Sequence, residues 1–169
     1  MQKVLVIGCP GSGKSTFARR LQALTGLPLI YLDQLFWNAN KTWVSPETLD
    51  ARIEAALSGD RWIIDGNYTR TLELRLQACD TVFFLDYPLE LCLQSVEQRV
   101  GTVRPDMPWV EEELDPEFAD FIRAFPQTTR PKILTLLEQY RDRAIHIFHS
   151  RAEADEFLTR LSPERGDAL

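Results

Sequence analysis

A glycine-rich run near the N-terminus has the residue types and the spacing needed to grip a phosphate group. Residues 8–15 read Gly-Cys-Pro-Gly-Ser-Gly-Lys-Ser, which matches the pattern GxxxxGK[ST] at every fixed position. Glycines allow several N–H groups to point at one anion, and the start of a following helix adds positive potential there. The residues expected to bind nucleotide phosphates are Gly8, Pro10, Gly11, Ser12, Gly13, Lys14, Ser15 and Thr16.

Three side chains of this run have distinct expected roles. Lys14 brings a point charge to the β- and γ-phosphates, and the Ser15 hydroxyl is suited to ligate Mg²⁺. Thr16 is expected to add a contact to the α-phosphate. The predicted cofactors are therefore ATP and Mg²⁺, although the motif does not by itself separate ATP from GTP.

Two aspartates, Asp33 and Asp65, each follow an apolar run that is typical of a strand. The carboxyl ends of parallel strands form the edge at which α/β sheets bind their ligands. A carboxylate at that edge can hold Mg²⁺ or its waters, take a proton from an attacking hydroxyl, or simply cap the next turn. Both aspartates are candidate site residues on this basis.

Four arginines flank a segment that is rich in proline and aromatic residues. Arg99 and Arg104 lie at its start, and Arg123 and Arg130 lie near its end. Phosphoryl transfer needs positive charge around the moving group and exclusion of water, so residues 101–129 are expected to form a lid-like insertion. In the alternative interpretation the arginines are exposed and pair with neighbouring glutamates, which contributes little energy.

An alternation of strands and helices is predicted to position these groups. Apolar runs predict strands at residues 4–7, 29–32, 61–65, 81–86 and 144–148. Helical spacing predicts helices after the glycine run, over 46–57, over 69–76, from 88, from 116 to 125, from 131 and over 152–161. This order predicts an α/β sheet that is covered by helices on both faces, within one domain over residues 1–169.

Composition narrows the class of protein. The 169 residues carry a net charge of −6, which argues against direct binding of nucleic acid because such binding needs clustered basic surface. The apolar runs are too short to cross a membrane. The three cysteines, Cys9, Cys79 and Cys92, have no metal-type spacing and indicate reduced thiols. A cytoplasmic protein without a secretory signal is expected, whereas the oligomeric state is left open.

The chain resembles a known group of phosphate-binding proteins. Its glycine run and the sequence Ile64-Asp65-Gly66-Asn67-Tyr68-Thr69-Arg70 are similar to those of the adenylate kinase group of P-loop kinases. Residues 99–107, together with Phe125-Pro126 and Arg130-Pro131-Lys132, resemble the DNA topology modulation proteins (FlaR type). The resemblance implies a three-layer P-loop NTPase fold with a parallel five-stranded sheet in the order 2-3-1-4-5.

The resemblance also implies roles for single residues. Asp65 would lie near Mg²⁺, Arg70 would bind the acceptor, and lid arginines would surround the transferred phosphate. The sequence departs from the group where adenylate kinases have Asp-Gly-Phe-Pro-Arg, because the stretch from Asp65 to Arg70 is one residue longer and more polar. The short aromatic segment before the third strand departs as well, so a monophosphate pocket does not follow.

The main hypothesis is a kinase that moves the γ-phosphoryl group of ATP to a small-molecule or nucleotide acceptor. Lys14, Asp33, Arg99, Arg123 and Arg130 are its expected catalytic residues, and Asp33, Tyr68 and Arg70 are expected to face the acceptor. Asp33 would be the base for a hydroxyl acceptor, whereas a phosphate acceptor would depend on Arg70. Ser15 and Asp65 are expected at the metal. The aromatic residues Phe36, Trp37 and Trp43 either stack on a planar acceptor or pack in the core.

Two rival hypotheses come from other functional classes. One is a nucleotide-dependent regulator of DNA topology, which the resemblance suggests. The other is an ATPase switch that acts through a protein partner.

Overall fold

The computed structural model describes residues 1–162 of the chain and contains one parallel sheet. Its strands are β1 (Lys3–Gly8), β2 (Leu29–Tyr31), β3 (Trp62–Asp65), β4 (Thr81–Leu85) and β5 (Ala144–Phe148). They lie in the order β2-β3-β1-β4-β5, and every neighbouring pair is parallel. The α/β class and the strand order predicted from the sequence are thereby confirmed. The predicted single domain extends to residue 169, so its last seven residues lie outside the described part.

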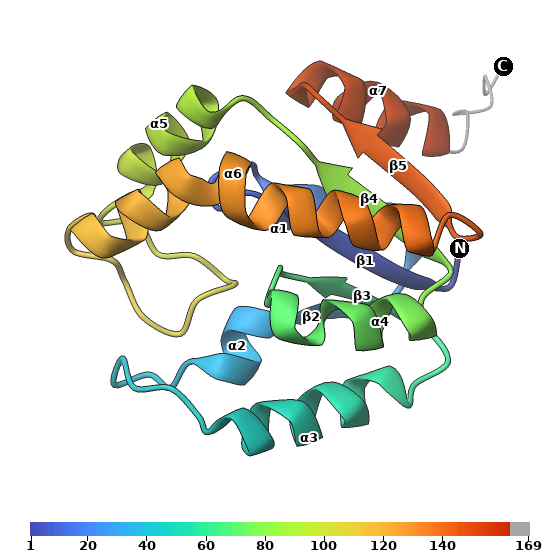
Figure 1. Cartoon of the computed structure of the whole chain (residues 1–169), viewed down its shortest axis with the longest axis horizontal. Coiled ribbons are helices and arrows are strands. Elements are labelled where there is room, and N and C mark those ends of the chain that lie inside the picture. The colour runs from blue at the N-terminus through green and yellow to red at the C-terminus, as the bar shows by residue number, and fades with distance from the viewer. Residues whose placement is uncertain (163–169) are drawn as a thin grey trace, which may run out of the picture.

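Helices cover both faces of this sheet (Figure 1). The helices are α1 (Lys14–Thr25), α2 (Leu32–Phe36), α3 (Pro46–Leu57), the 3₁₀ turn η1 (Thr69–Thr71), α4 (Leu72–Ala78), α5 (Leu89–Arg99), α6 (Pro116–Gln139) and α7 (Arg151–Leu161). Helix α1 packs with α7 on one face, and α4 and α6 lie across the other face. Helix α3 packs against α2 beside the β2 edge.

The central strands are buried on both faces, as a sheet between two helical layers requires. Val4 to Ile7 of β1 and Val82 to Phe84 of β4 have no exposed surface. Phe83 packs against Phe17 of α1 with ring centroids 5.1 Å apart, and against Phe157 of α7 at the same distance. This core holds the carboxyl ends of β1 and β3 in register, with Val6 paired to Asp65.

Helix α6 differs from the sequence prediction of two short helices separated by prolines. It runs unbroken over 24 residues and contains Pro126 and Pro131. Each proline removes one backbone hydrogen bond. However, the buried stripe continues through both prolines at helical spacing, with Ala119, Ile122, Phe125, Thr129, Ile133 and Leu137. Packing of this stripe therefore outweighs the local preference for a break.

Helix α2 was also not expected. The predicted strand over 29–32 ends at Tyr31, and a short helix begins at Leu32. Among residues 1–162, no helix combines the length and the hydropathy that a membrane crossing requires.

Candidate active site

The glycine loop leads from the end of β1 into α1 and packs tightly against β4 and α5. A Cβ at Gly8 would lie 2.6 Å from the carbonyl oxygen of Leu85. A Cβ at Gly11 would overlap the carbonyl oxygen of Cys92 and lie 2.8 Å from a methyl group of Val96. The φ angle of Gly11 is +84°, a conformation that costs little only for glycine. The loop is therefore a cradle that side chains would fill.

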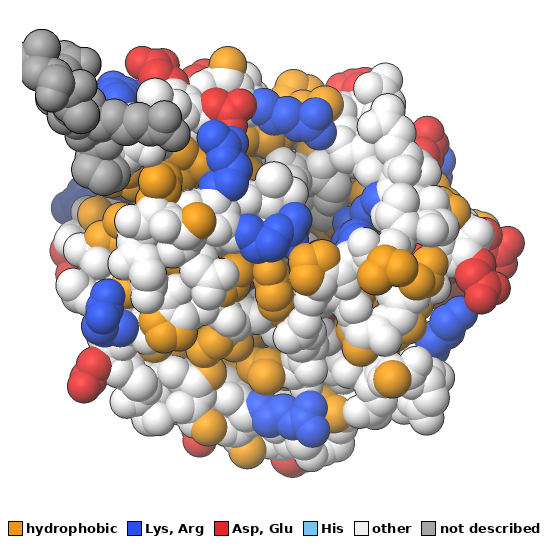
Figure 2. All heavy atoms as spheres, turned by 180° about the vertical axis from the view of Figure 1, so that it is seen from behind, with side chains coloured by type: hydrophobic (Ala, Val, Ile, Leu, Met, Phe, Trp, Pro, Cys, Tyr) orange, Lys and Arg blue, Asp and Glu red, His pale blue; other side chains and the backbone are white. Residues whose placement is uncertain are grey.

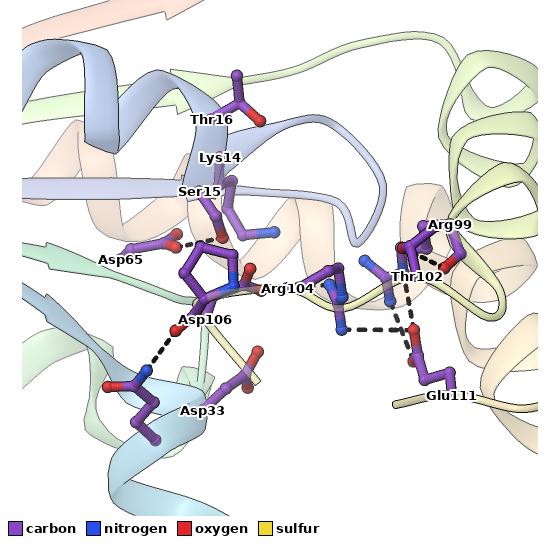
Figure 3. A network of polar contacts seen from close by, with 12 residues as sticks. Lys14, Ser15, Thr16, Asp33, Asp65, Arg99, Thr102, Arg104, Asp106 and Glu111 are labelled. Atoms are coloured by element: carbon purple, nitrogen blue, oxygen red, sulfur yellow. Dashed lines mark hydrogen bonds and ion pairs between the residues drawn. The ribbon is translucent and has the colours of Figure 1, made fainter. Parts of the chain in front are cut away.

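Lys14, Ser15 and Asp65 meet where β1 and β3 end (Figure 3). The Ser15 hydroxyl donates to Oδ2 of Asp65 at 2.5 Å. Oδ1 of Asp65 is buried and has no hydrogen-bond partner within residues 1–162. Burial raises the pKa of Asp65 to about 6, although the nearby Lys14 ammonium opposes this rise. An orphaned carboxylate oxygen beside a serine hydroxyl is a donor set that suits Mg²⁺.

A cavity of about 900 Å³ opens in front of these groups. Predicted site residues on its wall are Pro10, Gly11, Gly13, Lys14, Ser15, Thr16, Asp33, Asp65, Tyr68 and Arg99. Gly8 and Ser12 are buried behind the loop, and Ser12 lines a smaller adjoining hollow of about 400 Å³. The structure thus brings both strand-end aspartates and the glycine loop to one cavity.

Asp33, in the first turn of α2, faces this cavity. The Tyr68 hydroxyl donates to Oδ1 of Asp33 at 2.8 Å. Burial raises the pKa of the Asp33 carboxyl, while the hydrogen bond from Tyr68 and the charge of Lys14 lower it. Burial also raises the pKa of the Tyr68 phenol, so Tyr68 remains a donor. An oriented carboxylate with a raised pKa is suited to accept a proton.

The turn that carries Tyr68 is fixed by two residues whose roles the sequence did not reveal. Arg75 is fully buried and donates to the carbonyl oxygens of Gly66 at 2.9 Å and of Tyr68 at 3.0 Å. The Asn67 amide donates to the Gly8 carbonyl at 2.6 Å and accepts from the Gly8 N–H at 3.0 Å. These bonds tie the acceptor side of the cavity to the phosphate loop. Burial lowers the pKa of Arg75 to about 9.

An ion-pair network closes the cavity from the segment between α5 and α6. Arg99 pairs with Glu111 at 3.1 Å, and Arg104 contacts both Glu111 at 3.3 Å and Asp106 at 3.2 Å (Figure 3). Arg19 of α1 lies 3.8 Å from Asp106, which is only 4% exposed. Sequence reasoning found the arginines but missed the two acids. Within the predicted insertion 101–129, residues 101–115 have no helix or strand, and the rest is the first part of α6.

The other three predicted arginines point to partners away from the cavity. Arg70 makes two hydrogen bonds at 2.9 and 2.6 Å, Arg123 makes one at 2.7 Å, and Arg130 makes two at 2.7 and 2.8 Å. Their partners are Asp50, Asp120 and Asp86, respectively. None of the three is among the described residues that line the cavity.

Positive charge without a carboxylate partner gathers at the phosphate loop. Lys14 donates to the Cys9 carbonyl at 3.2 Å, and Arg151, which lines the cavity and the adjoining hollow, donates to Ser95 at 2.7 Å. Figure 2 shows several Lys and Arg side chains around a hollow on the back face, with acidic side chains mainly at the margin of the view. This distribution favours an anion at the loop end of the cavity.

Comparison with solved structures shows a shared fold. The shikimate kinase from Acinetobacter baumannii, in complex with shikimate, matches with a TM-score of 0.63 and 14% identity over 95% of this chain and 90% of that chain. The shikimate kinase from Bacteroides thetaiotaomicron matches with a TM-score of 0.56 and 17% identity over 94% of each chain. No protein-family model and no curated protein matches the sequence, so the resemblance to DNA topology modulation proteins is not confirmed. The chain has the shikimate-kinase-like P-loop fold.

Proposed function

We propose that this protein is a cytoplasmic, ATP-dependent kinase of a small molecule that bears a hydroxyl group. The observation that carries the proposal is that one cavity joins two groups of residues. One group, Lys14, Ser15 and Asp65, has the chemistry for a nucleotide and its metal, and the other, Asp33 and Tyr68, has the chemistry for an acceptor. The fold shared with two kinases of a small molecule supports this assignment.

The phosphate end would be built by the glycine loop. Its amides and Lys14 bind the β- and γ-phosphates, and Thr16 contacts the α-phosphate. Ser15 and Asp65 fit Mg²⁺ because one buried oxygen of Asp65 lacks a partner within the described chain. When bound, Mg²⁺ neutralises charge on the phosphate oxygens.

The acceptor end would be built by Asp33. Its carboxylate takes the proton of the acceptor hydroxyl as that oxygen forms a bond to the γ-phosphorus and the bond to the β–γ bridging oxygen breaks. ADP leaves with the electron pair of that bond, and Asp33 returns its proton to water. Tyr68 holds the carboxylate in place through its 2.8 Å hydrogen bond.

The segment from 101 to 129 would serve as the cover of the reaction. Arg99 and Arg104 line the cavity, and their side chains are 21% and 17% exposed. Positive charge placed in a partly dry site stabilises the transferred group more than it would in water. Exclusion of water also limits hydrolysis of ATP. Arg123 and Arg130 would join this cover only if they left their present partners.

Calorimetry with ATP and Mg²⁺, followed by an assay of ADP release with a panel of alcohols, tests the proposal. Lys14→Ala is expected to weaken ATP binding by about 100-fold, because a buried charge contact to phosphate is lost. Asp33→Asn is expected to retain ATP affinity but to lower kcat by roughly 10²- to 10⁴-fold. Failure of the wild-type protein to bind ATP would contradict the proposal, and so would full transfer activity in the Asp33→Asn variant.

A further inference from the structure

The charges around the cavity are divided between its two ends. At the lid side, the arginines on the wall already face carboxylates of the same chain, since Arg104 pairs with both Asp106 and Glu111, and Arg99 pairs with Glu111. At the loop end, Lys14 and Arg151 bond only to neutral oxygens within residues 1–162. The uncompensated positive charge therefore lies where the phosphates of the nucleotide are expected.

The acceptor end has the opposite character. Asp33, Asp65 and Asp106 lie close enough together that each of the latter two raises the pKa of Asp33 or of its neighbour through repulsion. Oδ1 of Asp65 is buried without a partner in the described chain. Arg70 is held by two hydrogen bonds to Asp50 and does not line the cavity. An anionic acceptor would thus meet three acids and no free cation there.

Aromatic side chains form a wall beside these acids. Phe36, Trp37 and Tyr68 line the cavity, and Tyr31 lies on the same wall. The ring of Phe36 lies 4.9 Å from that of Trp37 and 5.2 Å from that of Tyr68, so the three rings support one another. Aromatic walls with a few polar groups favour ligands that carry a ring.

We infer that the acceptor is an uncharged, ring-bearing alcohol rather than a phosphate- or carboxylate-bearing compound. This inference rests on the proposed function and adds the chemical class of its substrate. The ring contacts the aromatic wall, and the hydroxyl lies between Asp33 and the nucleotide. An additional carboxylate or phosphate on the acceptor is disfavoured because like charges repel strongly in a partly buried site.

Matched acceptor pairs that differ by one negative charge test the inference. The probes are adenosine against adenosine monophosphate, thymidine against thymidine monophosphate, and the methyl ester of shikimate against shikimate, with glycerol as an alcohol without a ring. Transfer from γ-labelled ATP is measured with Mg²⁺, and products are identified by mass spectrometry. The uncharged member of at least one pair is expected to have a kcat/KM at least ~10-fold above its charged partner, and above glycerol.

The outcomes separate this inference from the proposed function. If calorimetry detects no ATP binding, the proposed function fails. If ATP binds but the charged member of a pair is the better substrate, or no uncharged ring alcohol is phosphorylated, the acceptor class is wrong while nucleotide binding stands. If glycerol is used as well as the ring compounds, the aromatic wall does not select the substrate.

A change of charge at the acceptor end supplies an independent test. Thr69 lines the cavity beside Tyr68. Thr69→Lys is expected to shift the preference between uncharged and charged partners at least ~5-fold toward the charged one, because it adds a cation among acids. Thr69→Gln adds a long polar side chain without charge and serves as the matched control. Equal shifts in the two variants would overturn the electrostatic argument.

Discussion

The replacement Asp65→Asn tests the strained charge at the centre of the site. Burial raises the pKa of Asp65 to about 6, whereas an unfolded chain has an ordinary aspartate pKa near 4. The folded state therefore binds this proton more tightly, and its contribution to stability is present below pH 4 and is lost as the pH rises through about 6. A rise of two units corresponds to roughly 3 kcal/mol, of which about 2 kcal/mol is lost between pH 4.5 and 7.5.

Urea unfolding of the nucleotide-free protein in EDTA measures this effect at both pH values. The difference in unfolding free energy between the wild-type protein and the Asp65→Asn variant cancels the titration of all other groups. It is expected to shift against the wild-type protein by about 2 kcal/mol as the pH rises from 4.5 to 7.5. A difference that is independent of pH would show that Asp65 keeps an ordinary pKa, and the reasoning from its burial would be refuted. Addition of Mg²⁺ and ATP at pH 7.5 is expected to stabilise the wild-type protein more than the variant.

Three further predictions concern the loop, the lid and the buried arginine. Gly11→Ala is expected to lower stability by at least ~2 kcal/mol more than Gly13→Ala in urea unfolding, because both have positive φ but only Gly11 meets atoms within 4 Å. Arg99→Ala is expected to lower kcat by roughly 100-fold in the ADP-release assay, whereas the exposed Arg141→Ala changes it less than twofold; similar effects would argue against a lid role. Arg75→Met is expected to cost about 3 kcal/mol in thermal unfolding, since buried carbonyl groups lose their donor; an unchanged melting temperature would contradict this.

Much of the fold followed from the sequence because its strands are short, fully apolar runs. Such runs have few alternatives when helices alternate with them, and the resemblance supplied the strand order. Helix α6 was wrong in the prediction because the rule that proline ends a helix is local, whereas the buried stripe from Ala119 to Leu137 acts over the whole helix. Long-range packing of this kind is not visible in a window of a few residues.

The site was predictable only where a motif fixes the backbone. Lys14, Ser15 and Asp65 follow from the glycine loop and from the strand end, and they meet in the structure. The partners of Arg70 and Arg130 were not predictable, since Asp50 and Asp86 lie far along the chain from them. A charged side chain can reach several partners from one backbone position, and the choice among them depends on tertiary packing.

The prolines of α6 give this helix an articulated wall. Phe118 and Phe121 at its front line the cavity, while Arg130 at its rear is fastened to Asp86 by two hydrogen bonds. Pro126 lies between them and lacks the N–H that would bond back to the preceding turn. The helix is consequently most compliant between its cavity-facing front and its anchored rear. The front can swing over an incoming ligand while the sheet behind it keeps its shape.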